Sequence, residues 1–394
     1  MKIILAQHGA RHRYLIAQIL EQAGFLAALY TDSSAESLIG NLATKLPFQS
    51  GSLSRLANRK IEGVPSNKIY SSDITLYSGL IGKLISNQNN LKRGIRQHDV
   101  FSKKMQKWGC LNADAVYAMQ DESHDFLCYA KRKGLKIIID TCVTPLALRK
   151  TKQQQILNPG WEAEISDEEL TFFEDEFKKN LLIADIILCP SKVVESDLKQ
   201  FIPLLEAQIK VIPYGSSVSS GVNDPIRGRI LFVGAGCIRK GIHTLAKAAN
   251  KCVHNGVKFD FRVVGDVSDQ IKKKNEASNL NFIGKLPKEE LLEEYRLADV
   301  IVFPTLAEGL PGVILEALAY GLPIITTKSC GIEIEDGKSG FHIPEGDSSI
   351  LCKKLCVLVD DRTLRDAVSR QAKKLSKLYS NESYKVRLIE ALSW

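Results

Sequence analysis

Two carboxylates, Glu308 and Glu316, stand eight residues apart in the stretch AEGLPGVILEALAYGLPIITT, residues 307–327. The apolar run DVIVFPT before it predicts a buried strand, so the loop with Glu308 begins at the carboxyl end of that strand. Open parallel sheets bind ligands at this edge. Pro311 suits the first turn of the following helix, and the free amides of residues 309–313 then favour an anion such as phosphate. The candidate binding residues here are Glu308, Gly309, Leu310, Pro311, Gly312, Val313 and Glu316.

The two carboxylates suit hydroxyl groups better than the phosphate itself, because a carboxylate is a strong hydrogen-bond acceptor. Glu316 follows Gly312 by four residues, which places it on the helix face that looks back toward the loop. A diphosphate between two hydroxyl-seeking carboxylates describes a sugar nucleotide, with ribose on one side and a hexose on the other. The alternative is a pair of surface glutamates on an ordinary helix.

A second turn carries the basic pair Arg239 and Lys240. It lies in RILFVGAGCIRKGIHTL, a pattern that predicts a strand, a Gly-rich turn and a helix start. The glycines at 234, 236 and 241 do not make the G-x-G-x-x-G fingerprint, so the turn is only a weak dinucleotide signal. Taken alone, the two cations are equally consistent with a solvent-facing basic pair in a loop.

The segment with Glu308 and Glu316 resembles the E-x7-E motif of the retaining glycosyltransferases of family 4 type, which have the GT-B fold of two Rossmann-like domains facing across a cleft. EGLP and LEALAYGLP match that family around both glutamates. The resemblance implies that Glu308 lies against the donor hexose and that Glu316 binds the ribose hydroxyls. It also implies that Lys240, followed by Gly241, holds the donor diphosphate. Glu308 and Lys240 are the catalytic residues that it implies.

The resemblance covers roughly residues 170–394 and extends beyond these two turns. Ala235 stands where many members have Arg, and Arg239 is the candidate for supplying this charge. FIGKLPKEELL resembles the segment whose backbone meets the nucleotide base. Here that backbone belongs to Gly284, Lys285 and Leu286.

The first 160 residues match the family only in outline. Gly9, in HGARHRYLIAQILEQAGF, would let the backbone approach donor or acceptor, because glycine has no side chain. Many relatives have a His-rich turn after the strand at 115–119, but Tyr117 and Met119 stand where such histidines are expected. His124 comes later and is interpreted as an ordinary polar helix residue. The acceptor chemistry therefore stays open.

Short apolar runs rich in Val and Ile alternate with helical patterns along the whole chain, which predicts parallel sheets with right-handed crossovers. Helices are expected at about 241–255 and 288–298. Two such blocks predict two doubly wound α/β domains, residues 1–212 on the acceptor side and 229–378 on the nucleotide-sugar side. Residues 213–228 form a linker, and 379–394 resemble the terminal helix that returns to the first domain. The expected strands are 2–6, 25–30, 115–119, 136–140, 185–189, 209–212, 229–233, 260–264, 280–283, 299–303, 322–326 and 340–343.

The composition is that of a globular protein of 394 residues, with 44% hydrophobic and 25% charged residues. The start MKIILAQHGARHRY lacks the apolar run of a signal peptide, and no run approaches the ~20 apolar residues of a membrane span. Nine scattered cysteines without a CxxC pair indicate reduced structural thiols and no zinc site. We expect a cytoplasmic protein, with peripheral attachment to the inner membrane face as an option.

The net charge of +8 is concentrated between residues 45 and 107, where twelve Lys and Arg stand against Glu62, Asp73 and Asp99. Nucleic acid, an anionic lipid surface or a phosphorylated substrate would each suit such a stretch, and a solvated helical face is the simpler alternative. We expect no nucleic-acid partner and keep the anionic membrane surface as an option. The twelve cations are Lys45, Arg55, Arg59, Lys60, Lys68, Lys83, Lys92, Arg93, Arg96, Lys103, Lys104 and Lys107.

Transfer from a nucleotide sugar requires stabilisation of the negative charge that gathers on the departing diphosphate. Lys240, Arg239 and the amides of residues 309–313 would supply it. No DxD-like metal pair occurs in a strand–turn context, so we expect metal independence, no cofactor and a UDP- or GDP-linked donor. The acceptor is expected to be a glycan or a lipid-linked molecule. The resemblance implies retention of configuration, with the leaving phosphate deprotonating the acceptor hydroxyl.

Two other classes of protein stay open, because a fold does not fix a function. One is a dehydrogenase or nucleotide-sugar epimerase that uses one Rossmann half, although neither Gly-rich turn has the dinucleotide fingerprint. The other is a catalytically silent binding subunit of an envelope-polysaccharide assembly, which would keep the fold without turnover.

Overall fold

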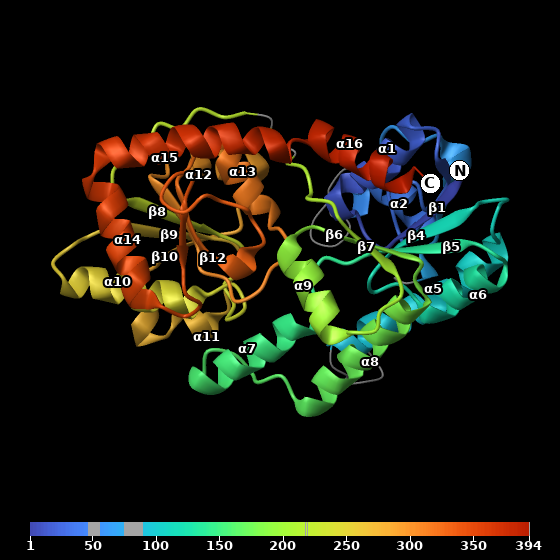
Figure 1. Cartoon of the computed structure of the whole chain (residues 1–394), viewed down its shortest axis with the longest axis horizontal. Coiled ribbons are helices and arrows are strands. Elements are labelled where there is room, and N and C mark those ends of the chain that lie inside the picture. Colours follow the sequence, from blue (N-terminus) through green and yellow to red (C-terminus); the bar gives the residue numbers. More distant parts are fainter. Residues whose placement is uncertain (46–55, 75–89, 217, 219, 394) are drawn as a thin grey trace.

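The computed structural model describes residues 1–45, 56–74, 90–216, 218 and 220–393, and of residues 90–97 it describes only the helix to which they belong. Figure 1 shows two lobes side by side, each built around its own sheet. We call residues 1–212 the N-lobe and residues 229–378 the C-lobe. Every strand pair of the two sheets is parallel. The predicted class, two doubly wound α/β domains, is therefore confirmed.

The N-lobe sheet has seven strands in the order β3-β2-β1-β4-β5-β6-β7. All six strands expected in this half are present, because runs of buried Val and Ile leave few other options. The additional strand, β3, is short and half-buried, so it carries no such signal. The strands are β1 (Ile3–Gln7), β2 (Leu26–Thr31), β3 (Ile69–Ser71), β4 (Ala115–Met119), β5 (Lys136–Asp140), β6 (Ile186–Cys189) and β7 (Gln208–Val211).

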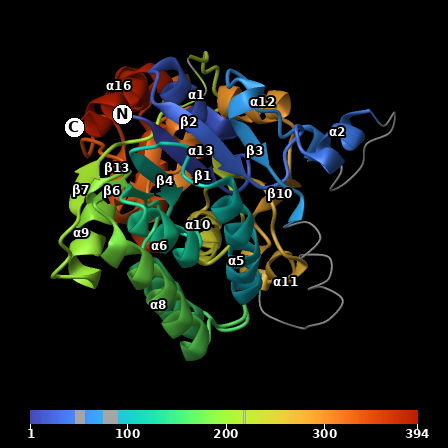
Figure 2. The same ribbon diagram turned by 90° about the vertical axis from the view of Figure 1, so that its right-hand side faces the viewer.

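Helices cover both faces of this sheet. Ile3 and Leu5 pack into a core on the face covered by α1 and α16, whereas Ile4 and Ala6 face the side covered by α5, α6, α8 and α9 (Figure 2). This alternation follows from the two-residue period of a strand. The helices are η1 (Arg11–Tyr14), α1 (Leu15–Gln22), α2 (Leu38–Thr44), η2 (Ser66–Lys68), α5 (Asn90–Trp108), α6 (His124–Arg132), α7 (Pro145–Leu157), α8 (Asp167–Ile183), α9 (Lys192–Phe201) and α16 (Asn381–Leu392).

The C-lobe sheet has six strands in the order β10-β9-β8-β11-β12-β13. All six expected strands are present, and the two expected helices are α10 and α12. The strands are β8 (Arg229–Val233), β9 (Asp260–Val264), β10 (Asn281–Gly284), β11 (Val300–Phe303), β12 (Ile324–Thr327) and β13 (Phe341–Ile343). The helices are α10 (Ile242–His254), α11 (Asp269–Lys272), η3 (Asn275–Ala277), α12 (Lys288–Leu297), α13 (Gly312–Tyr320), η4 (Lys328–Cys330), α14 (Ser348–Asp360), α15 (Arg362–Leu375) and η5 (Ser376–Tyr379).

Both sheets reverse their strand order at one point, which is where open α/β sheets bind ligands beyond the carboxyl ends of the strands. In the N-lobe this point lies between β1 and β4, and in the C-lobe between β8 and β11. The loops that follow these four strands are therefore the candidates for chemistry. Within the described residues, no helix is long and apolar enough to cross a bilayer.

Several connections join the two lobes among the described residues, and three of them are extended segments of the chain. The chain crosses once after β7 and returns through α15, η5 and α16, which run along one side of both lobes (Figure 1). On the N-lobe, α16 contacts α1, and Lys210 Nζ donates to the carbonyl of Ala391 at 2.7 Å. The third junction is the segment from α7 to α8, where Lys150 Nζ lies 3.0 Å from Glu345 Oε1 of the C-lobe.

A buried ion pair holds the C-lobe together behind the sheet. The Asp299 carboxylate, fully buried before β11, accepts from Arg365 Nε at 3.0 Å and from Arg362 Nη1 at 2.8 Å. It also accepts from the amide of Gly228 at 2.8 Å. Arg365 in turn donates to the side chain of Asn223 in the interlobe connection. This one carboxylate thus ties α15 and the end of the connection to the sheet.

We expect Arg365→Leu to lower the free energy of unfolding by about 3–5 kcal/mol, because it removes the buried cation that pairs with the buried Asp299. Denaturant unfolding followed by circular dichroism measures this loss. The matched control is Arg370→Leu, which changes an exposed arginine of the same helix. Equal stability of the two variants would show that the buried pair contributes nothing.

Candidate active site

The loop after β11 and the loop after β8 meet at the switch point of the C-lobe. The guanidinium of Arg239 donates through Nη1 to the carbonyl of Ala307 at 2.9 Å and to Glu308 Oε1 at 2.7 Å. Lys240 Nζ lies 3.8 Å from the same Glu308 oxygen. The structure therefore brings together three of the residues selected from the sequence, two cations and one carboxylate, at the carboxyl edge of neighbouring strands.

Gly241 lets these two loops pack directly on each other. Its φ of +80° lies in the left-handed region, and a Cβ there would come within 2.0 Å of the Pro304 carbonyl oxygen. Thr305 Oγ1 and the Leu306 amide both donate to the carbonyl of Arg239. The backbone on either side of the Arg239–Glu308 ion pair is therefore fixed, which prepares the cations for an incoming anion.

The first turn of α13 presents amides that have no protein partner. Helix α13 begins at Gly312, and Pro311 before it provides no side-chain cap. Among the described residues, no acceptor is found for the amides of Gly309, Leu310, Gly312 and Val313. Gly312 is exposed. Free amides at a helix start, together with the helix dipole, make this turn suited to an anion.

Glu316 lies one turn further along α13 and lines a cavity of about 1010 Å³ between the lobes. Tyr295 Oη donates to Glu316 Oε2 at 3.0 Å. Burial raises the pKa of Glu316, although the hydrogen bond from Tyr295 and the charges of Lys288 and Arg13 oppose this shift. Gly312 lines the same cavity, so the free helix start and the second carboxylate share one space.

The side chains of the predicted base-binding segment, residues 284–286, lie in two different environments. Leu286 lines the interlobe cavity, whereas the side chain of Lys285 turns to Asp266 at 2.6 Å on the surface. The carbonyl of Gly284 accepts from the amide of Gly265 at 2.8 Å. Leu286 is thus the member of this segment whose side chain reaches the cavity.

The N-lobe contributes the loop after β1 to the same cavity. Gly9 has a φ of +69°, and its amide donates to Asp32 Oδ1 at 2.8 Å. Three consecutive non-glycine residues follow in the left-handed region, His12, Arg13 and Tyr14, with φ of 49°, 52° and 59°. Such a run is strained, at about 1–2 kcal/mol per residue, and strain of this kind gathers at functional sites. His12 and Arg13 line the cavity, a role that the sequence analysis missed.

The loop after β4 departs from the family pattern as the sequence indicated. Tyr117 is buried and donates from Oη to Asp140 Oδ2 at 2.6 Å, and Met119 Sδ accepts from Arg11 Nη1 at 3.1 Å. His124 begins α6, where Nδ1 lies 3.0 Å from Asn180 Oδ1. The sequence analysis missed the pair of His8 and Glu122, whose side chains meet at 3.1 Å across the N-lobe switch point.

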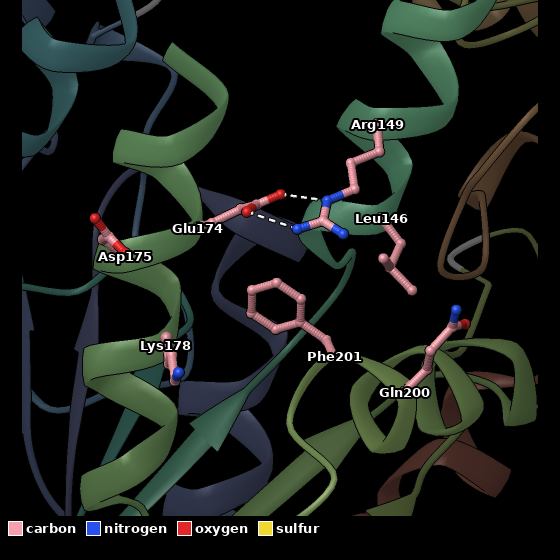
Figure 3. A pocket seen from close by; sticks show the side chains of 7 residues that line it. All are labelled: Leu146, Arg149, Glu174, Asp175, Lys178, Gln200 and Phe201. Atoms are coloured by element: carbon pink, nitrogen blue, oxygen red, sulfur yellow. Dashed lines mark hydrogen bonds and ion pairs between the residues drawn. The ribbon is translucent and has the colours of Figure 1, made fainter. Parts of the chain in front are cut away.

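A smaller cavity of about 300 Å³ lies among α7, α8 and α9 of the N-lobe (Figure 3). Its main feature is the ion pair of Arg149 with Glu174, two parallel hydrogen bonds of 2.5 and 2.8 Å. The cavity borders neither switch point loop, and its charges neutralise each other. We assign it no part in the chemistry.

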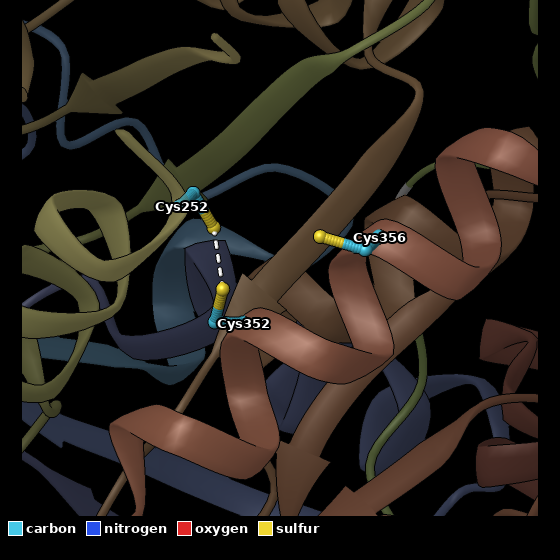
Figure 4. Close-up of side chains that lie close together, drawn as sticks. All are labelled: Cys252, Cys352 and Cys356. Atoms are coloured by element: carbon cyan, nitrogen blue, oxygen red, sulfur yellow. Dashed lines mark hydrogen bonds between the residues drawn. The ribbon is translucent and has the colours of Figure 1, made fainter. Parts of the chain in front are cut away.

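Among the described residues, one group of three possible metal ligands lies close enough together to hold an ion. It consists of Cys252, Cys352 and Cys356, between α10 and α14 (Figure 4). Cys252 Sγ and Cys352 Sγ lie 3.0 Å apart, and both residues are buried in the C-lobe core. Free cysteines commonly fill such a core as small apolar residues. None of the three belongs to the loops after β8 and β11.

Comparisons with known proteins match the C-lobe to one family. Residues 227–361 match the model of the family described as "Glycosyl transferases group 1". The uncharacterized glycosyltransferase MJ1178 of Methanocaldococcus jannaschii is 26% identical over 213 residues, 52% of this chain and 58% of that protein. The sulfoquinovosyl transferase SQD2 of Arabidopsis thaliana is 28% identical over 163 residues, 40% of this chain and 31% of that protein. The chain thus covers less than two thirds of the length of each of these relatives.

Solved structures resemble the whole chain. The structure of Anabaena Alr3699/HepE in complex with UDP and glucose superposes with a TM-score of 0.65 at 15% identity, covering 100% of this chain and 99% of that one. The sucrose-phosphate synthase of Thermosynechococcus elongatus gives a TM-score of 0.70 at 14% identity, covering 100% and 98%. At these identities the likeness concerns the fold.

Two Rossmann-like lobes with loops meeting across a cleft define a protein of the GT-B class. Within this fold, residues 227–361, most of the C-lobe, match the group 1 glycosyltransferases.

We expect Lys240→Ala to weaken the binding of inorganic pyrophosphate about tenfold, since a hydrogen bond to a charged group is worth about 1.5–3 kcal/mol and this lysine is partly exposed. Arg239→Ala should weaken it similarly, because the Arg239 guanidinium and the Lys240 ammonium lie around the same Glu308 oxygen, at 2.7 and 3.8 Å. Both cations can therefore reach one anion. Isothermal titration calorimetry measures both effects. Lys273→Ala, at an exposed position of the same lobe, is the control. Unchanged affinity in both site variants would remove the basic pair from the anion site.

Proposed function

We propose that the protein transfers a hexose from a nucleoside-diphosphate sugar to a hydroxyl group of a glycan or lipid-linked acceptor, with retention of configuration and without a metal ion. The observation that carries this proposal is the meeting of Arg239, Lys240 and Glu308 beside the free helix start of α13. The names of its relatives, which include a sulfoquinovosyl transferase and a capsular polysaccharide biosynthesis glycosyltransferase, support this class of reaction. The complex of HepE with UDP makes UDP the first nucleotide to test.

In this proposal the diphosphate of the donor replaces Glu308 as the partner of Arg239. The phosphate oxygens then accept from Arg239, Lys240 and the free amides of the α13 start. Glu308, released from its ion pair, accepts hydrogen bonds from the hexose hydroxyls. Glu316 accepts from the ribose hydroxyls inside the interlobe cavity, where Leu286 offers an apolar surface to the base.

The reaction breaks the bond between the anomeric carbon and the diphosphate oxygen, and the electron pair leaves with the diphosphate. The acceptor hydroxyl oxygen forms the new bond to that carbon on the same face. Its proton passes to the leaving phosphate, so no protein base is required. Arg239, Lys240 and the α13 amides stabilise the growing negative charge, because they are fixed before the reaction starts.

The two glutamates should separate into different kinetic roles. We expect Glu316→Gln to weaken the binding of UDP or GDP by about ten- to a hundredfold, because the ribose loses a charged acceptor. Glu308→Gln should instead lower turnover by about 10²-fold, the scale for one preorganised group, while nucleotide affinity stays within threefold. Calorimetry and donor turnover in the presence of EDTA measure the two effects.

Glu289→Gln, an exposed carboxylate on α12, is the control for both measurements. Normal binding and turnover in both site variants would contradict the assignment. Binding without turnover in the unchanged protein, over UDP-, GDP- and ADP-sugars and a range of acceptors, would favour a silent binding subunit. Turnover that appears only after Mg²⁺ or Mn²⁺ is added would contradict the metal-free mechanism.

The basic stretch 45–107 is relevant to where the protein meets its acceptor. Arg55 and Lys83 lie outside the described residues, as do the side chains of Lys92, Arg93 and Arg96. Of the described cations, Arg59 and Lys68 form ion pairs with Asp32 and Glu21, and Lys60 lines the interlobe cavity. Lys103 and Lys107 are exposed one turn apart on α5. We propose that exposed cations of this kind attach the N-lobe to an anionic membrane surface.

Vesicle co-sedimentation tests this attachment. We expect more protein in the pellet with phosphatidylserine vesicles than with neutral vesicles at low salt, and release at high salt, since each cation near the surface contributes ~1 kcal/mol and is screened by salt. Lys103→Glu with Lys107→Glu should reduce the pelleted fraction. The pair Lys272→Glu and Lys273→Glu on α11 of the other lobe is the control. Equal pelleting with both lipids would make the stretch a solvated surface.

A further inference from the structure

The switch point of the N-lobe, between β1 and β4, has its own pocket of about 360 Å³, which we call the N-lobe pocket. The connection from β4 to α6 forms its floor with Asp121 and Glu122, α5 adds His98 and Asp99, and α8 adds Phe173 and Phe177. These residues come from positions 98 to 177 and meet only because the sheet brings their elements together. The pocket occupies the position at which a doubly wound domain binds a ligand.

Glu122 is unusual among the residues of this pocket, because it is a buried carboxylate with one unpaired oxygen among the described residues. Its side chain is 1% exposed. Oε1 accepts from the Ser123 amide at 2.8 Å and pairs with His8 Nε2 at 3.1 Å. Oε2 finds no donor among the described residues. A buried carboxylate oxygen without a donor costs about 1–3 kcal/mol, so a ligand that offers a hydroxyl or amino hydrogen would recover this energy.

The surroundings of the His8–Glu122 pair favour the charged form of both side chains. Burial opposes the charge on His8, but the charge and hydrogen bond of Glu122, with Asp32 and Asp121 nearby, raise the pKa of His8 above its usual value. Burial likewise opposes the charge on Glu122, but His8, His98 and the Ser123 amide lower its pKa. The ring of His98 stacks on that of His8 with a centroid distance of 3.9 Å. Glu122 is therefore a fixed hydrogen-bond acceptor at neutral pH.

The other charges of the pocket are mainly negative. Asp99, Asp121 and Glu176 join Glu122 around the pocket, against the single permanent cation Arg11 among its described lining residues. These negative side chains repel a phosphate or carboxylate ligand in the pocket. Phe173 and Phe177, with ring centroids 6.1 Å apart, provide an apolar wall beside the carboxylates. Acceptors beside an apolar wall suit a molecule with hydroxyl groups on its edge and C–H bonds on its faces.

The pocket adjoins the donor loop of the C-lobe. Cys142 lines the pocket, and its carbonyl oxygen would lie 1.9 Å from a Cβ placed on Gly309. Arg11 lines the pocket as well, and the next residue, His12, lines the interlobe cavity. A ligand in the N-lobe pocket would therefore be separated by Cys142 from Gly309, the residue that follows Glu308.

We propose that the N-lobe pocket binds an uncharged sugar unit of the acceptor, with its hydroxyl groups donating to Glu122 and Asp121 and one face against Phe173 and Phe177. This inference rests on the proposed function, because it assigns the second substrate of the same transfer. The sugar unit can belong to a growing glycan or to a lipid-linked sugar. The chemistry that the pocket recognises is the same in both, and it excludes a phosphate or uronate group at this position.

The test compares two glycosides that differ in one charge. Ligand-observed NMR on the full chain with bound UDP measures the affinities for methyl β-glucoside and methyl β-glucuronide. We expect the neutral glycoside to bind at least tenfold more tightly. Asp121→Asn combined with Glu176→Gln should reduce this ratio below threefold by improving the binding of the glucuronide. Glu122→Gln should weaken the neutral glycoside at least fivefold.

Asp175→Asn is the matched control, because this exposed carboxylate neighbours Glu176 on α8 but lies outside the pocket. If Glu122→Gln does not fold, the double variant decides, since Asp121 is exposed and Glu176 only half-buried. Equal affinities for the two glycosides, or a ratio unaltered by the double variant, would overturn the inference. Failure to bind any nucleotide would instead count against the proposed function, since calorimetry with UDP alone measures it separately.

Octyl β-glucoside and a neutral methyl disaccharide then distinguish the two sources of the sugar. Tighter binding of the octyl compound indicates a lipid-linked acceptor, and tighter binding of the disaccharide indicates a glycan. Either preference supports the inference if it depends on Glu122 and Asp121. Binding of both compounds without that dependence would overturn it.

Discussion

The two lobes meet backbone to backbone at Gly309, and the geometry of the cleft depends on this contact. A side chain at this position would overlap the carbonyl of Cys142 at 1.9 Å, and a Cβ on Gly331 would lie 2.0 Å from the carbonyl of Gly309 itself. Three main-chain segments, after β5, β11 and β12, are thus as close as they can be. The side chains of Pro190 and Ser191 border the same contact, with Cγ and Oγ at 2.8 and 2.7 Å from Cβ atoms placed on Gly309 and Gly331. The separation of the two switch points therefore depends on glycine at both positions.

This separation explains why charges from distant parts of the sequence act on one space. Arg13 of the N-lobe opposes the upward shift in the pKa of Glu316, which belongs to α13 of the C-lobe. Glu308 lies beside Arg239 from another strand of its own sheet, and Lys240 approaches the same oxygen. Glu308 is already paired with both cations, and Glu316 already accepts a hydrogen bond from Tyr295. A donor diphosphate would therefore exchange partners among charges that exist, which requires less rearrangement than building a site on arrival.

Much of the fold was predictable because most of its strands are buried. Runs such as residues 137–139 and 300–303 are apolar on both faces, a pattern that belongs to few structures other than a parallel sheet. Strand β3 was not predictable, since its three half-buried residues show no alternation of apolar and polar side chains. Of the residues in the proposed donor site, Glu308 and Lys240 could be selected because each follows a strand at a turn. Their meeting could not be predicted in the same way. Strands β8 and β11 are neighbours because of the strand order, and no local sequence pattern encodes that order.

The N-lobe residues were harder to select for a related reason. His8 and Glu122 are 114 residues apart and only become a pair when β1 and β4 lie side by side. Tyr117 and Met119 stand where histidines were expected, so the residue types of this loop did not indicate a functional pair. Arg13 has no feature in the sequence that separates it from its basic neighbours, because its position depends on a left-handed turn of three residues that ordinarily avoid it.

The segment after α7 has a consequence for how the chain can be divided. Trp161, numbered with the N-lobe, is 2% exposed, packs against His243 of the C-lobe and belongs to its core. Its neighbour Glu162 accepts from the amide of Ile238, next to Arg239. A fragment that ends at residue 212 would expose an indole ring to water, and the complementary fragment would lose the group that caps its basic loop. The boundary visible in the sequence is therefore not a boundary of cooperative folding, and neither half is expected to be an independent unit.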